Sequence, residues 1–270
     1  MSIIGVISKM KTRLINDKPE YKLPIDDELV LINDYIGKEI NLEFLGEIIC
    51  PSCNIKIKKS YSQGYCYLCS QRLACCDMCI LKPEQCHYQD NTCREPKWAK
   101  DNCFKEHIIY IANSSGIKVG ITRKSNIPSR WIDQGAVQAL AILKVKSNDK
   151  VARYKSGLIE VALKKYVSDR TSWQKMLKGE VEDVDLIAKK SELIDNITSE
   201  IKAEEAMILN ADIVNINYPV LEYPQKVISL NFDKEPNIKG KLLGIKGQYL
   251  ILDCGVLNIR KFSSYKIAFN

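Results

Sequence analysis

The order of hydrophobic and polar residues divides the chain into stretches of different character. Residues 1–49 alternate apolar and polar positions and are interrupted at Asn16-Asp17 and at Pro24. Such alternation is typical of strands with one buried face. Residues 211–270 show the same character, with runs of Val, Ile and Leu separated by glycines. We expect β-rich segments at both ends, with a small C-terminal barrel or sheet that the N-terminal strands complete.

The middle of the chain carries both strand and helix signals. Within residues 106–180, two strands joined by a turn are followed by a short helix, a third strand and a longer helix. The first four of these elements are expected at 107–113, 117–122, 129–134 and 139–145. The last helix is expected to begin at a cap formed by Asn148 or Asp149 and to end near Val167. Residues 181–210 repeat Leu and Ile near helical spacing, which indicates a helical connector.

Ten of the eleven cysteines lie between Cys50 and Cys103. Cys50-Pro-Ser-Cys53 and Cys66-Tyr-Leu-Cys69 are two CxxC pairs. Each pair places two sulfurs on one tight turn, so both pairs can face a single ion at Zn–S distances of about 2.3 Å. This layout is that of a zinc ribbon. Because four thiolates leave no open coordination position, we expect a structural rather than a catalytic zinc.

The remaining cysteines indicate a second metal site, and their spacing leaves its ligand set open. Cys76-Asp-Met-Cys79 repeats the CxxC pattern, and Cys86 with Cys93 completes the most economical tetrahedral set. Three further residues in or beside this block can each replace one of these ligands: Cys103, His87 and His107. Since His107 precedes an apolar strand, it can equally be a hydrogen-bonded framework residue.

The start of the chain argues against disulfides. Its apolar residues are followed at once by Lys9, Lys11 and Arg13, which is not the pattern of a signal peptide. No stretch reaches the roughly 18 apolar residues of a membrane span. We therefore expect a cytoplasmic protein with reduced thiols, where clustered cysteines point to metal or redox chemistry, zinc first and an iron–sulfur cluster second. No pattern indicates a small-molecule cofactor or a membrane partner.

Positive charge is concentrated in the middle of the chain. The formal net charge of the whole protein is +7. Residues 94–180 alone hold 18 Lys and Arg against 8 Asp and Glu, so the rest of the chain is slightly acidic. A basic stretch between near-neutral ends is the footprint of a polyanion partner, most simply nucleic acid. A solvated basic face without a partner would give the same count.

The predicted ββαβα unit resembles the GIY-YIG nuclease fold. Ile-Ile-Tyr110 stands where that family has its first tripeptide, and Lys118-Val-Gly120 stands at the position of the second. Over a longer span, the chain resembles DUF2797, a bacterial family whose name implies no established activity. That resemblance covers most of residues 45–180, extends more loosely to both ends, and is carried by 82–87, 92–96 and 127–136.

The nuclease resemblance implies roles for three residues. Tyr110 would help to activate the attacking water, Arg130 would stabilise charge on the scissile phosphate, and Glu160 would bind Mg²⁺ or Mn²⁺. Lys118 departs from the family because it replaces the second tyrosine, so half of the hydroxyl machinery is absent. Plainer interpretations are a strand tyrosine, an arginine packed on its neighbouring tryptophan or binding phosphate without chemistry, and a glutamate in a surface ion pair.

We therefore expect an α+β protein in which a zinc-ribbon-like module and a GIY-YIG-like unit are flanked by β-rich segments. The expected divisions are 1–49 (β-rich), 50–105 (cysteine module), 106–180 (GIY-YIG-like unit), 181–210 (helical connector) and 211–270 (β-rich).

The expected function is nucleic-acid binding by a zinc-containing protein. Residues expected at the nucleic acid are Lys118, Arg123, Lys124, Arg130 and Trp131. RNA is favoured over DNA because aromatic side chains can stack on unpaired bases. The stacking candidates are Tyr61, Tyr65, Tyr67, Trp98 and Trp131. The alternative is a divalent-metal-dependent, structure-selective endonuclease, and a remoter one is a redox or iron–sulfur protein.

Overall fold

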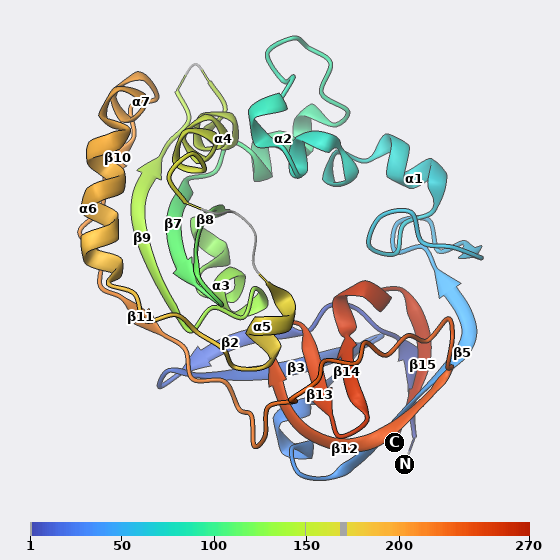
Figure 1. The fold of residues 1–270 in the computed structure, drawn as a ribbon. Coiled ribbons are helices and arrows are strands. Elements are labelled where there is room, and N and C mark those ends of the chain that lie inside the picture. The colour runs from blue at the N-terminus through green and yellow to red at the C-terminus, as the bar shows by residue number, and fades with distance from the viewer. Residues whose placement is uncertain (1, 149, 168–171) are drawn as a thin grey trace.

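The N-terminal and C-terminal segments of the chain meet in one sheet. The computed structural model describes residues 2–148, 150–167 and 172–270. Antiparallel strands of this sheet follow the order β1-β15-β5-β12-β13-β14, and β6 pairs with the end of β5 (Figure 1). Their bounds are Ile3–Val6 (β1), Tyr265–Phe269 (β15), Glu39–Ile49 (β5), Asn237–Lys246 (β12), Tyr249–Leu252 (β13), Gly255–Asn258 (β14) and Lys56–Ile57 (β6). The N-terminal strands thus complete the C-terminal sheet, as expected.

A second sheet of order β2-β3-β4 packs on the first. It consists of β2 (Lys11–Ile15), β3 (Lys18–Ile25) and β4 (Glu28–Leu31). Asn16 and Asp17 connect β2 to β3 with φ angles of 46° and 60°, the left-handed conformation that a two-residue hairpin turn requires. Pro24 does not interrupt a strand as expected, because it lies inside β3 opposite Leu29.

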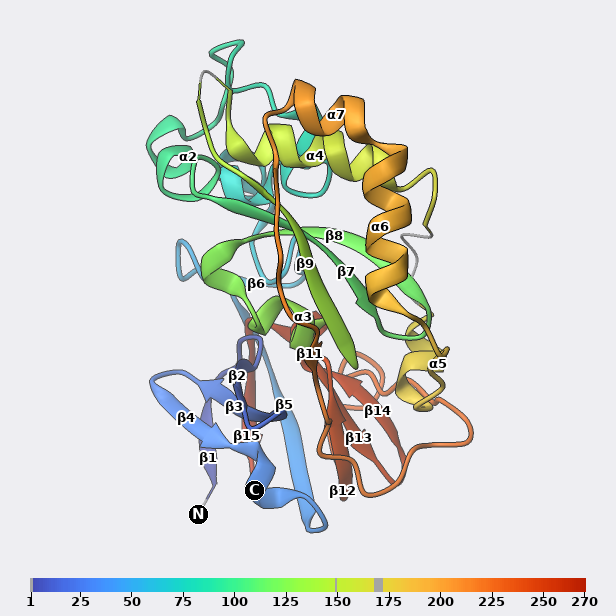
Figure 2. The same ribbon diagram turned by 90° about the vertical axis from the view of Figure 1, so that its left-hand side faces the viewer.

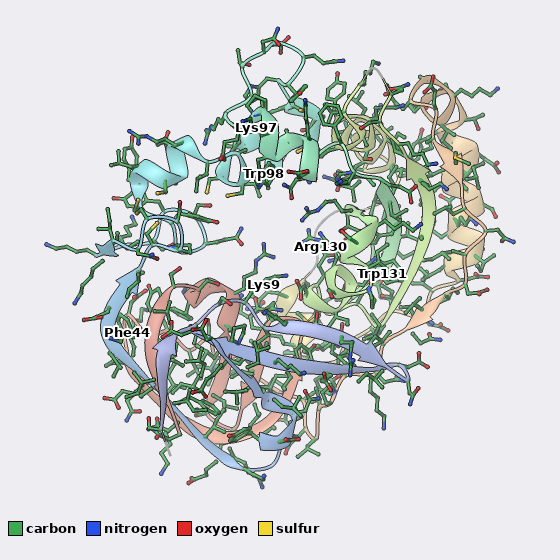
Figure 3. All side chains as sticks on the ribbon, turned by 180° about the vertical axis from the view of Figure 1, so that it is seen from behind. Lys9, Phe44, Lys97, Trp98, Arg130 and Trp131 are labelled. Carbon is green, nitrogen blue, oxygen red and sulfur yellow. The ribbon has the colours of Figure 1, made fainter. Side chains whose placement is uncertain are left out.

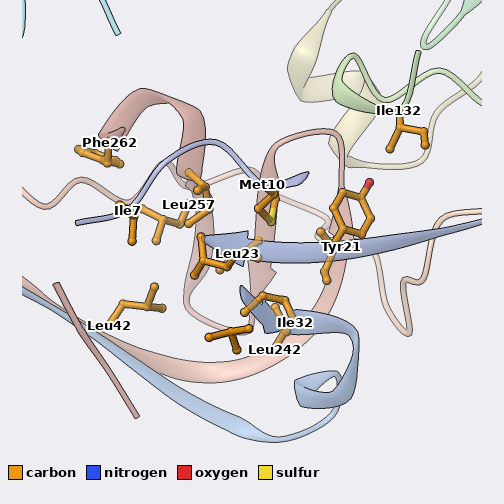
Figure 4. Close-up of a cluster of buried hydrophobic side chains, with 14 of the residues drawn as sticks. Ile7, Met10, Tyr21, Leu23, Ile32, Leu42, Ile132, Leu242, Leu257 and Phe262 are labelled. Atoms are coloured by element: carbon orange, nitrogen blue, oxygen red, sulfur yellow. The ribbon is translucent and has the colours of Figure 1, made fainter. Parts of the chain in front are cut away.

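The two sheets bury a common hydrophobic core (Figure 4). Leu23, Leu42 and Leu242 come from three strands and are each fully buried. Phe262, at the end of the 3-10 turn η6 (Ile259–Phe262), closes one side of the core. Burying such side chains contributes roughly 1.5–3 kcal/mol each. These two sheets together form the β-rich region. Ile132, which lies in the central unit of residues 106–180, belongs to the same core, so the central unit is anchored on the β-rich region.

The central unit is built on a sheet in which β7 lies between β8 and β9. The elements follow the order ββαβα along the chain: β7 (His107–Asn113), β8 (Ile117–Arg123), α3 (Ser129–Asp133), β9 (Gln138–Val145) and α4 (Ala152–Leu163). Two short strands, β10 (Met207–Ile208) and β11 (Val214–Asn215), pair with the outer edge of β9. The mixed helix and sheet content confirms the predicted α+β class.

The helices that follow β9 differ from their predicted bounds. α4 begins only at Ala152, where the Ser147 hydroxyl accepts a hydrogen bond from the Ala152 N–H at 2.8 Å. The expected caps were Asn148, which instead accepts from the Lys150 N–H at 3.1 Å, and Asp149, which lies outside the described residues. The local turn that precedes the helix therefore uses the Asn148 side chain, and the Ser147 hydroxyl takes the place of the expected cap.

The helical connector is two helices rather than one. α6 (Leu186–Asn196) and α7 (Thr198–Ala203) are separated at Ile197, whose φ of −124° leaves the helical conformation. Leu193 and Ile201 pack with the central sheet in a second core, and Figure 2 shows both helices against that sheet together with α4. A further short helix, α5 (Trp173–Leu177), precedes them.

Residues 50–106, which we call the cysteine arch, run from the end of β5 to the start of β7 (Figure 1). Their helical elements are all short: α1 (Tyr67–Arg72), η2 (Ala74–Cys76), η3 (Met78–Ile80), η4 (Pro83–Gln85) and α2 (Pro96–Asn102). A small cluster joins Ala99 and Cys103 to Val151 of the central unit. The described part of the arch thus has little apolar core of its own.

Candidate metal centre and basic cleft

Four sulfur atoms converge where β5 enters the cysteine arch. Cys50 and Cys53 lie in the turn after β5, and Cys66 caps α1, which carries Cys69. All four sulfurs lie within 4.8 Å of one another, and Cys53 Sγ is 3.8 Å from Cys66 Sγ. An ion with tetrahedral Zn–S bonds of about 2.3 Å has sulfur–sulfur edges of about 3.8 Å. This set therefore has the geometry to hold a metal ion such as zinc.

Backbone N–H groups favour the thiolate form at this site. The Cys66 N–H donates to Cys50 Sγ at 3.4 Å, and the Cys69 N–H donates to Cys66 Sγ at 3.4 Å. Burial disfavours the Cys50 thiolate, but the N–H groups of Cys66, Cys53 and Ser52 outweigh burial and lower the pKa of Cys50 to about 6. Cys50 is thus favoured as the thiolate, the form that binds metal, whereas the neighbouring sulfurs and burial raise the pKa of Cys53 and raise that of Cys69 to about 12.

A second group of cysteines surrounds a small cavity between η3, η4 and α2. The cavity has a volume of about 20 Å³. Its sulfur-bearing lining residues are Cys79, Cys86, Cys93 and Cys103. Asp77 and His87 also line it, and their ligand atoms lie within 4.8 Å of the sulfur of Cys79. Burial raises the pKa of Cys79 to about 12 and that of Cys103 to about 11.

Two residues considered for the second site lie elsewhere. Cys76 Sγ is 3.9 Å from Cys75 Sγ, and neither residue is among those that line the cavity. His107 is fully buried, and its Nδ1 lies 2.7 Å from the carbonyl oxygen of Lys105. Burial lowers the pKa of His107 to about 4. His107 is thus not among the described residues that line the cavity, and its Nε2 is buried without a hydrogen-bond partner among them.

A cleft of about 640 Å³ lies between the cysteine arch, the central unit and the β-rich region. Figure 3 shows Lys9, Trp98 and Arg130 around it. The cationic side chains that line it are Lys9, Lys11, Arg123, Arg130, Arg153 and Arg260. Among the described lining residues, the single carboxylate is Asp133, which pairs with Lys9 at 2.7 Å. The cleft is therefore strongly positive.

The other cleft cations are oriented mainly by neutral groups. Arg153 donates to the carbonyl oxygen of Ile80 at 2.6 Å, and Arg260 donates to Gln63 Oε1 at 3.1 Å. No carboxylate of the described residues pairs with Arg130. Neutral acceptors hold a guanidinium in place without cancelling its charge, so the positive potential of the cleft is preserved.

The three residues that the nuclease resemblance selects interact electrostatically with one another but do not share the cleft. Tyr110 is fully buried, and its hydroxyl donates to Gln134 Oε1 at 2.9 Å. Glu160 lies 3.5 Å from Lys164 in an ion pair. Burial raises the pKa of both Tyr110 and Glu160. Of the three, only Arg130 is among the described residues that line the cleft.

Lys118, in place of the second tyrosine of the nuclease motif, is a buried cation. It is 7% exposed and lies on β8, two residues before Gly120. Burial, and to a smaller extent the neighbouring Arg130, lower the pKa of Lys118 to about 8. Gly120 pairs with Tyr110 across the strands, and a Cβ there would lie 2.5 Å from the tyrosine hydroxyl. The glycine therefore makes room for the buried ring.

Comparison with known proteins identifies the family. The sequence model described as "Protein of unknown function (DUF2797)" matches residues 37–267. The chain belongs to the DUF2797 family. Neither the curated proteins nor the solved structures contain a match. The matched span of this DUF2797 protein includes the cysteine arch and the central unit, while Lys9 and Lys11 of the cleft precede it. In the described residues, no helix is long and apolar enough to cross a bilayer.

The aromatic residues considered for base stacking lie in different environments of the DUF2797 protein. Trp98 lines the cleft. Trp131 is 3% exposed and packs edge-on against Tyr110, so its ring offers no stacking surface, contrary to expectation. Tyr61 and Tyr67 are exposed and contact each other edge-on, with ring centroids 5.4 Å apart. Tyr65 is half-buried, and its hydroxyl accepts from the Cys75 thiol at 3.5 Å.

Sequence reasoning missed part of the cleft of the DUF2797 protein. Lys9, Lys11 and Arg260 line it although they lie outside the basic middle of the chain. Lys9 and Lys11 form a short basic run with Arg13, and Arg260 lies beside Lys261, but neither pattern indicates that these residues meet the central unit. Conversely, Lys124, expected at the nucleic acid, pairs with Glu106 at 3.3 Å and is not among the residues that line the cleft.

Proposed function

We propose that this DUF2797 protein binds nucleic acid in its basic cleft. The observation that carries the proposal is the gathering of six cationic side chains around one carboxylate that already has a partner. Like charges that line one cleft repel one another, and a bound polyanion relieves that repulsion. The phosphate backbone of a nucleic acid supplies such a charge along a line, which suits a cleft better than a single small anion does.

The proposed ligand is unpaired RNA, such as a single strand or the loop of a folded RNA. Trp98 lies in the same cleft as Arg123 and Arg130, so a base can stack on the ring while neighbouring phosphates reach the guanidinium groups. Stacking of this kind needs a base that is not already paired. Duplex DNA would use the cations but not the ring.

Zinc is the proposed ion of the first cysteine site, as a structural component. A closed set of four thiolates matches the preference of zinc and leaves no position for a substrate. The ion would be held by Cys50, Cys53, Cys66 and Cys69, and it would join the end of β5 to α1. Its role in binding would be indirect, because it would hold one wall of the cleft in place.

The alternative, a divalent-metal-dependent endonuclease, is supported by the ββαβα order and by the electrostatic interaction of Arg130 with Tyr110 and Glu160. Two contacts favour binding without cleavage. The Tyr110 hydroxyl is enclosed and donates to Gln134, and Glu160 is paired with Lys164. Cleavage would require both groups to leave these partners and reach the cleft.

The test is a binding measurement with matched lysine variants. Fluorescence anisotropy with labelled single-stranded RNA, single-stranded DNA and duplex DNA gives Kd at several salt concentrations. Lys11→Gln should weaken RNA binding and reduce the salt slope by about 0.7, the value for one phosphate contact on a single strand. Lys202→Gln, at an exposed position of α7 outside the cleft, is the control and should change neither quantity.

Two results would count against the proposal. One is the absence of salt-dependent binding to any of the three nucleic acids at low ionic strength. The other is an equal effect of Lys11→Gln and Lys202→Gln, which would place binding outside the cleft. Incubation of the same RNA with Mg²⁺ or Mn²⁺ tests the alternative. Cleavage that is lost in Glu160→Gln while binding is kept would replace simple binding by nuclease activity.

A further inference from the structure

We infer that the cysteine arch holds a second metal ion, bound by Cys79, Cys86, Cys93 and Cys103. This inference is independent of the nucleic-acid proposal, because it concerns only the chemistry of the arch. It selects one ligand set from those that the spacing allows, with Cys103 in place of Cys76. The two metal centres would then use eight of the ten cysteines of the arch.

The distribution of the cysteines carries the argument. Six cysteines of the arch remain after the first site is assigned, and two of them, Cys75 and Cys76, lie together at 3.9 Å. The other four line one enclosed cavity of about 20 Å³, which is about the volume needed for one water or one ion. All four are free thiols. Four thiols around a space of this size supply, once metal binding deprotonates them, the soft ligands that an ion such as Zn²⁺ prefers.

A rival set, Asp77, Cys79 and His87, is tighter in distance but already saturated. Asp77 Oδ2 lies 2.6 Å from Arg94 Nε and 3.4 Å from His87 Nε2. Asp77 Oδ1 accepts from the Cys79 N–H at 3.2 Å. His87 Nδ1 lies 2.7 Å from Thr92 Oγ1. A metal bound by this set would break the Asp77–His87 contact and compete with an arginine for the carboxylate. The set is better explained as a network that orients the turn around Cys79.

The four sulfurs also define what binding must do to the cavity. Within the described chain, no three of these sulfurs lie within 4.8 Å of one another. A tetrahedral zinc requires edges of about 3.8 Å. Binding therefore draws the turns η3 and η4 and the end of α2 toward the cavity. The inference predicts a local contraction, which the first site does not need.

Contacts to the central unit give this centre a structural consequence. Arg153 of α4 donates to the carbonyl oxygen of Ile80, next to Cys79. A Cβ at Gly157 would lie 2.6 Å from the backbone nitrogen of Glu84, so α4 packs closely on η4. The second ion would therefore fix a segment that is docked on α4 and carries one wall of the cleft.

The test begins with the metal content of the whole protein purified under reducing conditions. Wild type should contain two zinc ions per chain. Cys93→Ser should contain one zinc ion. Cys76→Ser is the matched control, because Cys76 lies in the same arch but does not line the cavity, and it should contain two. His87→Ala should also contain two, because that histidine belongs to the rival set only. One zinc in wild type, or two in Cys93→Ser, would overturn the inference. Iron with sulfide would also overturn it.

A cobalt titration of the wild type keeps the inference testable if Cys93→Ser does not fold. Thiolate-to-cobalt charge-transfer absorbance should rise linearly to two equivalents of Co²⁺ per chain. In Cys53→Ser, which disrupts the first site, one equivalent with a four-thiolate spectrum should remain. Saturation of the wild type at one equivalent would contradict the inference. A second ion with no thiolate charge-transfer band of its own would assign it to nitrogen and oxygen ligands instead, and would also contradict it.

Discussion

The β-rich region and the cysteine arch are stabilised in different ways, although they face each other across the same cleft. The β-rich region buries a continuous core that includes Leu23, Leu42 and Leu242. The arch buries few apolar side chains and instead brings its cysteines together. The wall of the cleft that is anchored on the hydrophobic core is therefore expected to persist under any condition in which the protein is folded. The wall formed by the cysteine arch is expected to depend on metal.

Removal of metal should have the largest effect, and only on one side of this comparison. Zinc binding to small thiolate modules contributes on the order of 10 kcal/mol to their folding. With a strong chelator, or in Cys66→Ser, amide hydrogens of the arch should exchange rapidly while those of β12 and β13 stay protected. Hydrogen-exchange mass spectrometry measures both regions in one experiment. Equal loss of protection in both would show that the arch and the β-rich region unfold together.

A substitution in the hydrophobic core should have the next largest effect, and on the opposite side. Phe262→Ala removes a fully buried ring that contacts Phe232 at 4.9 Å between centroids, and such changes cost about 3–5 kcal/mol. Denaturant unfolding should show this loss while the zinc content of the folded protein stays at the wild-type value. Leu221→Ala, at a residue that is 67% exposed, is the control and should change stability by less than about 0.5 kcal/mol.

The sequence predicted the elements that local patterns determine. Short apolar runs and the hairpin turn between the first two gave β7, β8 and β9 close to their observed bounds. The left-handed turn at Asn16 follows from residue type, since Asn tolerates positive φ. The two CxxC pairs of the first metal site are likewise local. Each pair needs only one turn of chain, and the observed sulfurs lie together as expected.

What the sequence could not predict depends on contacts between distant segments. Arg260 reaches the cleft only because β14 and β15 bring the turn η6 beside the central unit, and no local pattern indicates that meeting. Cys76 and Cys79 share the CxxC spacing, but Asp77 between them has extended backbone, with ψ of 153°. The two cysteines therefore lie on separate turns, η2 and η3. Spacing alone cannot distinguish this arrangement from a metal-binding knuckle.

The two walls should also contribute differently to binding. Trp98 lies on α2 of the arch, whereas Arg130 lies on α3 beside Ile132 of the hydrophobic core. In zinc-loaded protein, Trp98→Ala and Arg130→Gln should each weaken RNA binding by about 1–3 kcal/mol. After chelation, Trp98→Ala should have no further effect, while Arg130→Gln should still weaken binding. Anisotropy with and without chelator measures this. Persistence of the Trp98 effect in metal-free protein would contradict the division between the walls.

The smallest expected effect is a pH dependence from Lys118, which was expected at the nucleic acid but is buried near Arg130 and is not among the described residues that line the cleft. Burial and Arg130 lower the pKa of Lys118 to about 8, while exposed lysines keep pKa values near 10.4. Lys118 is thus charged at pH 7 and largely neutral at pH 9, and its attraction for phosphate is lost as pH rises between these values. The change in Kd should be about fivefold or less, since a partly screened charge contributes about 1 kcal/mol.

Lys118→Met should remove this pH dependence and Lys202→Met should keep it, in the presence and in the absence of chelator. A pH dependence that survives in Lys118→Met would assign the titrating group elsewhere, and one that disappears with chelation would place it on the metal-dependent wall.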